Sequence, residues 1–256
     1  MSGTVLSPAE AVVLLQPNVA NGLKAIKVTM LQMLSQGLLK LELRDRPGLI
    51  GVKHVPCLRI VREPSGAPYD ARAVLDLVNA AQAEGGELKA VVKRASKDWG
   101  AAALRFVTEL VRPALISRGL LAEKQLLFIR TYHPTPAGEA ERRRLQADLA
   151  QAREIPQLLK TDPARAAAVA AAVGIAILLD DKLTSQFAPL AEAMRVRFPP
   201  GDVQSGDASF DIGGFNLGSF DTGAMGSLDA GIASFDAGFS GGGSDSGSGD
   251  GGGGGD

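Results

Sequence analysis

A pattern that occurs twice in the chain constrains its fold more than any other feature: a helix that ends at a glycine, followed at once by short apolar strands. In the second copy the helix ends within Ile116 to Leu121, where Gly119 can take the left-handed conformation that terminates helices. An apolar run through Ile129 follows, and Thr135-Pro136-Ala137-Gly138-Glu139 opens the next helix with an N-cap and an early proline. A shorter copy reads Leu34-Ser35-Gln36-Gly37-Leu38-Leu39. This order is typical of winged-helix units, so the sequence predicts two of them.

Residues 1–63 are predicted to form the first helix-wing module. Ser7-Pro8-Ala9-Glu10 has the N-cap, proline and glutamate of a capping box, and predicts a short helix to about Leu15. A second helix is predicted over 22–36. Alternating apolar and charged residues then indicate a half-buried strand at 39–43. The expected turn and return strands lie at 45–48, 49–52 and 57–61.

Residues 64–145 are predicted to form the second winged-helix-like module. A helix is expected from Tyr69 or Asp70 to Gly85-Gly86, then a short helix at 88–95. Ser96 is expected to cap a longer helix that runs to Gly119 and is kinked by Pro113. The expected wing strands are 120–121 and 126–129, and the helix after Pro136 carries Arg142, Arg143 and Arg144.

Residues 146–200 are predicted to be C-terminal helices that pack on the same body. The apolar run from Ala166 to Leu179 covers only ~21 Å as a helix, too short for a ~30 Å hydrocarbon core. It is therefore expected to be a buried helix rather than a membrane span. A last amphipathic helix is expected at 180–198.

Residues 201–256 are predicted to be a disordered tail rich in glycine, serine and aspartate. The tail holds nine aspartates and no lysine or arginine, which leaves 19 acids against 27 bases, a formal +8, in residues 1–200. Ser-Phe-Asp recurs at Ser209, Ser219 and Ser234. Because a tethered acidic segment has a high effective concentration, we expect the tail to cover the basic surface around Lys89, Lys93, Arg94 and Lys97. The alternative is a flexible tail that only keeps the protein in solution.

Few residues suit catalysis or metal binding. Cys57 is the single cysteine, so the chain itself holds no disulfide and no multi-cysteine zinc site. His54 and His133 lie near the predicted wings and lack metal-ligand spacing, and no glycine-rich phosphate loop occurs. The sequence predicts no enzyme, no cofactor and no metal site. No secretory leader is apparent at the start, which favours the cytoplasm.

The candidate binding residues are basic and cluster beside a tryptophan: Lys89, Lys93, Arg94, Lys97 and Trp99. They indicate an anionic partner, either a membrane surface or nucleic acid. DNA reading is disfavoured because the helix start near Trp99 offers few side chains that bind base edges, and Asp98 would oppose phosphate. Many winged-helix modules bind proteins instead.

The chain resembles an uncharacterised group of bacterial proteins, often membrane-attached, with paired helical-wing modules and glycine-rich C-terminal tails. The residues that carry this likeness are Leu6 to Glu10, Met33 to Leu39, Ile116 to Leu121, Thr135 to Gly138 and Ala171 to Ile175. The same order is more distantly similar to the Golgi-phosphoprotein family, which binds phosphoinositides on membranes through a tryptophan pair with arginines. This chain has one tryptophan, so no lipid-site residue is carried over.

The sequence therefore predicts a mainly α protein of two winged-helix-like modules with small β-wings, a C-terminal helical pair and a disordered tail. The function expected first is that of a non-enzymatic adaptor or regulatory module acting through protein contacts. Peripheral binding of anionic membrane, with phosphoinositide-like head groups, is the second expectation, and winged-helix DNA binding is the third.

Overall fold

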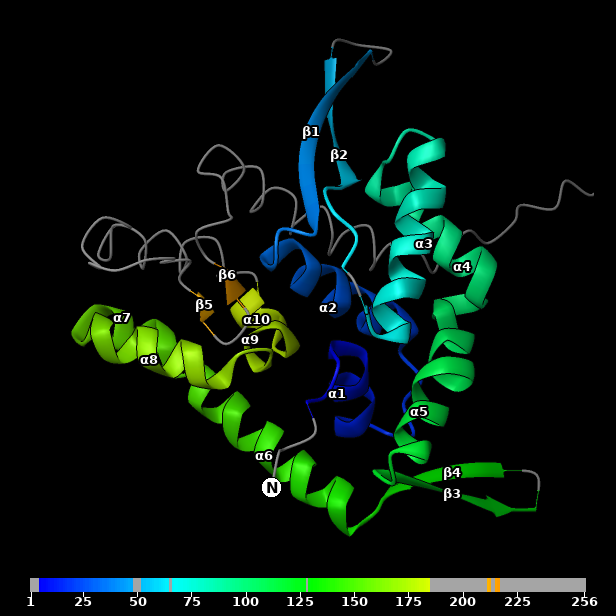
Figure 1. Ribbon diagram of the computed structural model, residues 1–256, viewed down its shortest axis with the longest axis vertical. Coiled ribbons are helices and arrows are strands. Elements are labelled where there is room, and N and C mark those ends of the chain that lie inside the picture. Colours follow the sequence, from blue (N-terminus) through cyan, green and yellow to red (C-terminus); the bar gives the residue numbers. More distant parts are fainter. Residues whose placement is uncertain are drawn as a thin grey trace, which may run out of the picture.

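The structure, a computed structural model, describes residues 5–47, 52–64, 66–127 and 129–184, together with 211–212 and 215–216 of the tail. It is mainly helical and carries small antiparallel hairpins, as predicted (Figure 1). The short helix α1, Pro8–Leu15, lies in the middle of the body. It packs against α2, α5 and α6. No helix among the described residues is both long enough and apolar enough to cross a bilayer.

The described helices are α1, α2 (Gly22–Ser35), α3 (Tyr69–Ala83), α4 (Leu88–Trp99), α5 (Arg112–Ser117), α6 (Pro136–Ala152), α7 (Ile155–Thr161), α8 (Pro163–Val173), α9 (Ala176–Leu179) and α10 (Asp181–Thr184). A 3₁₀ turn, η1 (Ala101–Ala103), and a π-helix, η2 (Phe106–Val111), connect α4 to α5. The strands are β1 (Leu39–Pro47), β2 (Val52–Ile60), β3 (Leu121–Leu126), β4 (Ile129–Pro134), β5 (Asp211–Ile212) and β6 (Phe215–Asn216). β1 pairs with β2, β3 with β4 and β5 with β6, and each pair forms a separate two-stranded antiparallel sheet.

One hydrophobic core runs through the body. It includes Leu14 of α1, Ile26 and Met30 of α2, Phe106 of η2 and Ile155 of α7, all with less than 2% of their surface exposed. Burial of apolar side chains of this size contributes about 1.5–3 kcal/mol each. The segments 1–63, 64–145 and 146–184 therefore share one core.

Both predicted helix-terminating glycines have the expected conformation, with φ +65° at Gly37 and +68° at Gly119. At each site the two hydrogen bonds of a Schellman motif form. Leu38 N donates to Met33 O at 2.9 Å, and Leu120 N donates to Leu115 O at 2.9 Å. The two copies of the pattern thus end their helices in the same way and lead directly into the hairpins.

The two hairpins are longer than the sequence indicated. β1 pairs with β2 in the register Leu39↔Ile60 to Pro47↔Val52, so 45–47 belong to a strand and the predicted turn at 45–48 was placed too early. In the second hairpin Leu126 faces Ile129 across the tip. The predicted strand 126–129 was wrong, because these residues span the end of β3 and the start of β4.

The helix predicted to start at Ser96 was also placed wrongly. α4 continues through Ser96 to Trp99, and the break comes at Gly100, with φ +78°. Ala102 and Ala103 have φ +53° and +51°, a conformation that costs L-residues free energy. The helix type changes from π to α at Arg112, next to Pro113, whose missing N–H removes one helical hydrogen bond.

The C-terminal helices differ from the prediction at Gly174. This glycine has φ +48° and separates α8 from α9, so the apolar run 166–179 is two helices. α8 buries Ala166 and Ala170 but exposes Ala168 and Ala172, because it lies on the surface of the body. Within the predicted last helix, only α10 and Asp180 fall in the described residues. The remainder of that helix and most of the tail lie outside them.

Substituting valine at Gly119 should destabilise the protein by at least about 1 kcal/mol, because a β-branched residue is strained at positive φ. No atom lies within 4 Å of an added Cβ there, so the cost is purely conformational. Gly37→Val should behave alike in the first copy of the pattern. Gly119→Asn is the control, since asparagine tolerates this conformation. Urea denaturation curves in which Gly119→Val and Gly119→Asn coincide would contradict the prediction.

Candidate functional site

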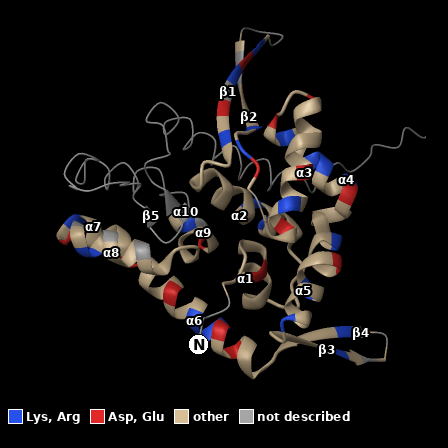
Figure 2. Cartoon of the chain, viewed as in Figure 1, with Lys and Arg blue, Asp and Glu red and all other residues tan. Residues whose placement is uncertain are grey.

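The structure divides the predicted basic cluster between two sides of α4. Lys89, Lys93 and Lys97 are exposed and four residues apart, so they follow one helical face about 6 Å apart along the axis. No carboxylate in the described part of the chain lies within ion-pair distance of them. Figure 2 shows blue segments along α4 and on both long hairpins. The three lysines form an exposed basic stripe.

Arg94 and Trp99 lie on a different side of α4. Arg94 Nε forms an ion pair with Asp98 Oδ2 at 2.7 Å. The ring of Trp99 meets Phe106 edge to face, with centroids 5.7 Å apart, and is half-buried. Both residues line a hollow of about 380 Å³ between α3 and α4. The structure therefore does not bring all five predicted residues to one surface.

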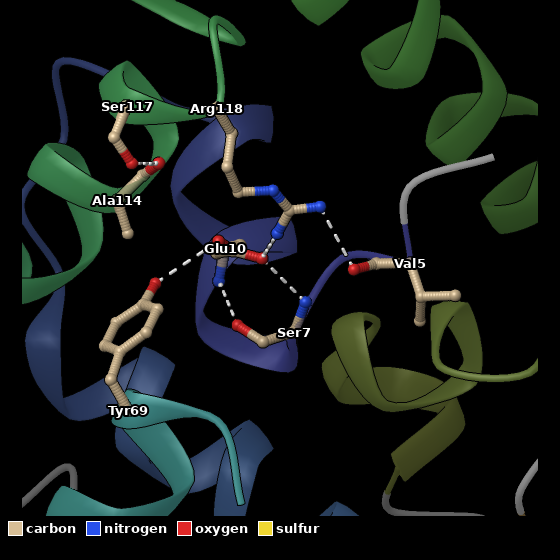
Figure 3. Close-up of polar contacts among 7 residues, drawn as sticks. All are labelled: Val5, Ser7, Glu10, Tyr69, Ala114, Ser117 and Arg118. Carbon is tan, nitrogen blue, oxygen red and sulfur yellow. Dashed lines mark hydrogen bonds and ion pairs between the residues drawn. The ribbon is translucent and has the colours of Figure 1, made fainter. Parts of the chain in front are cut away.

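A buried polar network joins the ends of three helices (Figure 3). Glu10 in the first turn of α1 is 1% exposed, and its Oε2 accepts the Ser7 amide at 2.9 Å, which completes the predicted capping box. Tyr69 at the start of α3 donates its hydroxyl to Glu10 Oε1 at 3.3 Å. Arg118 at the end of α5 forms an ion pair with Glu10 and donates to Val5 O. Burial and the neighbouring Glu10 carboxylate raise the pKa of Tyr69.

Asp70 is buried next to this network. Its side chain has no exposed surface, and no donor among the described residues reaches either carboxyl oxygen with hydrogen-bond geometry. Burial raises the pKa of Asp70 because it disfavours the charged form. The Ser7 hydroxyl and the Ala71 amide oppose this effect, whereas the charge of Glu10 adds to it. Glu10 is thus a carboxylate with partners for both oxygens, whereas Asp70 is a buried carboxyl group whose pKa is raised.

This network suits a structural role better than acid–base catalysis. Arg118, Tyr69 and Ser7 already occupy both oxygens of Glu10, and Asp70 does not line the adjacent hollow of about 410 Å³. Cys57 is buried, and burial raises its pKa, so its thiolate is disfavoured. His133 is exposed, with Nε2 3.2 Å from Thr131 Oγ1. No group of metal-binding side chains occurs among the residues that the structure places.

The base of the second hairpin is clamped to the loop between α1 and α2. Asn18 forms two hydrogen bonds with the backbone of Tyr132 in β4, at 2.8 and 3.1 Å. Arg112 donates to Pro17 O at 2.8 and 3.1 Å, and its guanidinium lies 4.1 Å from the centre of the Tyr132 ring. These contacts fix the direction in which the hairpin β3–β4 leaves the body.

The tip of the same hairpin is apolar and exposed. Leu127 is 84% exposed and Ile129 67% exposed, with Lys124 and Arg130 on the flanking strands. Leu127 has φ +52°, which costs a leucine about 1–2 kcal/mol. Packing among the described residues does not explain an exposed apolar residue held in a strained backbone conformation.

A groove of about 1010 Å³ is formed by α1, the α1–α2 loop, α2, α6, α7, α9 and α10. Its apolar lining includes Val12, Leu15, Leu149, Leu179 and Leu183. Its charged lining is Lys24, Arg153, Asp180 and Lys182. None of the five predicted site residues lies in it.

Asp180 organises one end of this groove. Arg153 Nε lies 2.7 Å from Asp180 Oδ2, and Asp180 Oδ1 accepts the Lys182 amide at 2.9 Å. Burial raises the pKa of Asp180, but the hydrogen bonds from Arg153 and from the Lys182 and Leu183 amides outweigh it and lower the pKa. Asp180 is therefore a fixed anion that holds Arg153 at the groove.

The sequence reasoning missed the groove, the network around Glu10 and the apolar tip. The tip had a signal, because the run from Leu126 to Ile129 is apolar where a hairpin needs a turn. Glu10 was recognised only as part of its capping box, since Tyr69 and Arg118 are far away in the sequence. The groove combines residues from seven segments, and no local pattern marks it.

Arg118→Met should destabilise the protein by about 2–3 kcal/mol, because it leaves the charge of Glu10 buried without its partner. The double variant Glu10→Gln/Arg118→Met should lose less than Arg118→Met alone, since glutamine can keep the capping box without a charge. Urea denaturation of the three proteins measures this coupling. A double variant at least as unstable as Arg118→Met would show that the ion pair is not the main contribution of Arg118.

Asp70→Asn should stabilise the protein at neutral and alkaline pH. Because its pKa is raised on folding, Asp70 adds fully to the free energy of unfolding below the ordinary aspartate pKa of 3.8. This stabilisation is lost as the pH rises through the raised pKa. Asparagine does not titrate, so the stability difference should grow in favour of the variant as the pH rises. Denaturation curves measured from pH 4 to pH 8 test this, and a difference independent of pH would contradict it.

No protein-family model matches this chain, and comparisons with curated proteins and with solved structures find no match either.

Proposed function

We propose that this protein is a non-enzymatic adaptor that binds another protein through the tip of the β3–β4 hairpin. The observation that carries this proposal is the exposed apolar pair Leu127 and Ile129 at the end of a hairpin whose base is fixed to the body. Exposed apolar residues at a protruding, preoriented position are typical of interaction sites.

Three features support protein contacts in particular. The tip is small, and among the described strands β3 and β4 pair only with each other, so their outer edges beyond the Asn18 contact can accept a partner strand. The clamp formed by Asn18 and Arg112 reduces the orientational freedom that binding would otherwise remove. The two long hairpins project from the helical body in different directions, so an adaptor of this shape can contact two partners (Figure 1). We also propose that the two helix-hairpin modules are winged-helix units.

Anionic membrane is the second candidate. Lys124 and Arg130 flank the apolar tip, which is the arrangement that favours insertion between anionic head groups. The basic stripe Lys89, Lys93 and Lys97 adds charge, but the half-buried Trp99 packs on Phe106 instead of projecting with it. DNA binding has less support, because the segment after Gly100 begins with three alanines. We place the protein in the cytoplasm, where either partner is accessible.

The double variant Leu127→Asn/Ile129→Thr should abolish partner binding without loss of stability. Asparagine tolerates the positive φ of Leu127, so the free energy of unfolding should stay constant or rise by up to about 1 kcal/mol. A photoreactive phenylalanine at the exposed Gln125 reports on binding in the native cells. With the intact tip we expect a protein adduct of discrete mass, and with the double variant we expect none.

Val61→Thr is the matched control, since Val61 is 52% exposed and lies outside the hairpin tip. It should leave the adduct unchanged. Sedimentation with phosphatidylserine-containing vesicles tests the second candidate, and tip-dependent binding to vesicles with no protein adduct would replace the adaptor proposal. An adduct that forms equally with the double variant would remove the tip from the function altogether.

A further inference from the structure

The described body ends at the groove formed by α1, α2, α6, α7, α9 and α10. α10 is described as far as Thr184, and two of its residues, Lys182 and Leu183, line the groove. Residues 185–256 therefore continue from a point beside this groove. Any segment of the tail is tethered to it at high effective concentration.

The groove combines apolar surface with positive charge. Val12, Leu15 and Leu149 are half-buried, so part of their apolar surface remains open to solvent. Three cations, Lys24, Arg153 and Lys182, line it together with one acid, Asp180. An occupant that fits this surface is an acidic peptide with apolar side chains next to its carboxylates.

The tail contains that chemistry four times. The motif Ser-Φ-Asp-x-Gly, where Φ is Phe or Leu, starts at Ser209, Ser219, Ser227 and Ser234. Each copy places a large apolar side chain directly before an aspartate, and the tail carries no lysine or arginine that would repel the groove. Repetition of one short motif in an otherwise simple composition is typical of multivalent binding.

Four residues of the tail are described, and two of them, Asp211 and Ile212, belong to the first copy of the motif. Asp211 and Ile212 form β5, Phe215 and Asn216 form β6, and the two strands pair as Ile212↔Phe215. β5 packs against α8 and β6 against α2, the helix that contributes Lys24 to the groove (Figure 1). The described tail residues thus contact α8 and α2, whereas the rest of the tail, which the sequence led us to expect around Lys89, Lys93, Arg94 and Lys97, lies outside the described residues.

We propose that the groove is the intramolecular binding site for the Ser-Φ-Asp-x-Gly repeats of the tail. The aspartate of the bound repeat faces the cations Lys24, Arg153 and Lys182, and the Phe or Leu covers the apolar lining. Four repeats share one groove, so release of one is followed by binding of another. The inference is independent of the hairpin proposal, which concerns a different surface.

Carbodiimide coupling of the full-length chain tests the site, because this reagent joins a lysine amine to a carboxylate only when the two are in contact. Peptide mapping should find links from Lys24 or Lys182 to Asp211, Asp221, Asp229 or Asp236. Mixing isotope-labelled and unlabelled chains separates links within one chain from links between two. In the full chain with Phe210, Phe220, Leu228 and Phe235 changed to serine, these links should fall at least fivefold although every carboxylate remains.

A labelled peptide of residues 207–223 measures competition. At a tail effective concentration of about 1 mM, a peptide with a dissociation constant near 0.1 mM should bind the serine-substituted chain about tenfold more tightly than the natural chain. Lys24→Gln/Lys182→Gln should weaken this binding, whereas Lys89→Gln/Lys93→Gln should not. Links mainly to Lys89, Lys93 or Lys97, links only between chains, no tail links, or equal peptide affinity for both chains would each overturn the proposal.

Discussion

The contact between Glu10 and Arg118 is the constraint on which the arrangement of the two hairpin-bearing segments depends. Glu10 completes the capping box of its own helix. Its carboxylate also accepts a hydrogen bond from Tyr69 and forms an ion pair with Arg118, both from the other segment. Ionised carboxylates are not buried without such partners. Because Glu10 is 1% exposed, the starts of α1 and α3 and the end of α5 have to meet at one point. α1 can then occupy the middle of the core although it has only two turns.

The two segments also hold each other's hairpins. Leu58 in β2 donates its amide to Gly86 O at 2.8 Å, and Cys57 bridges to Glu87, both from the α3–α4 connection. In return, Asn18 and Pro17 from the first segment bind Tyr132 and Arg112 of the second. Isolated two-stranded hairpins are marginally stable in water, so these contacts at the base make the projecting hairpins possible. Because the contacts at the base stabilise each hairpin, the tips do not have to, and the tip of β3–β4 can carry exposed apolar residues.

Local patterns predicted what local chemistry decides. The capping box at Ser7, the left-handed glycines 37 and 119, and the N-cap at Thr135 are each set by neighbours in the sequence, and all were confirmed. The errors arose where tertiary contacts decide. Ser96 looked like an N-cap, but Val92 and Ala95 bury on the same face as Val91 and keep α4 continuous to Trp99. Likewise, Gly174 in an alanine-rich run gave no sign that the chain turns there to bring Asp180 to Arg153.

The position of the basic binding surface could not be predicted from the density of lysine and arginine along the sequence. Lys89, Lys93 and Lys97 lie close together in the sequence, yet they offer charge alone on an exposed helix face, where water and salt screen it over about 8 Å. Lys24, Arg153 and Lys182 come from three distant segments, and only folding brings them beside half-buried leucines and valines. A surface that is both charged and apolar can distinguish Phe-Asp from other acidic sequences, whereas a surface that is only charged cannot. The groove therefore selects the repeated motif and not merely a segment with many aspartates.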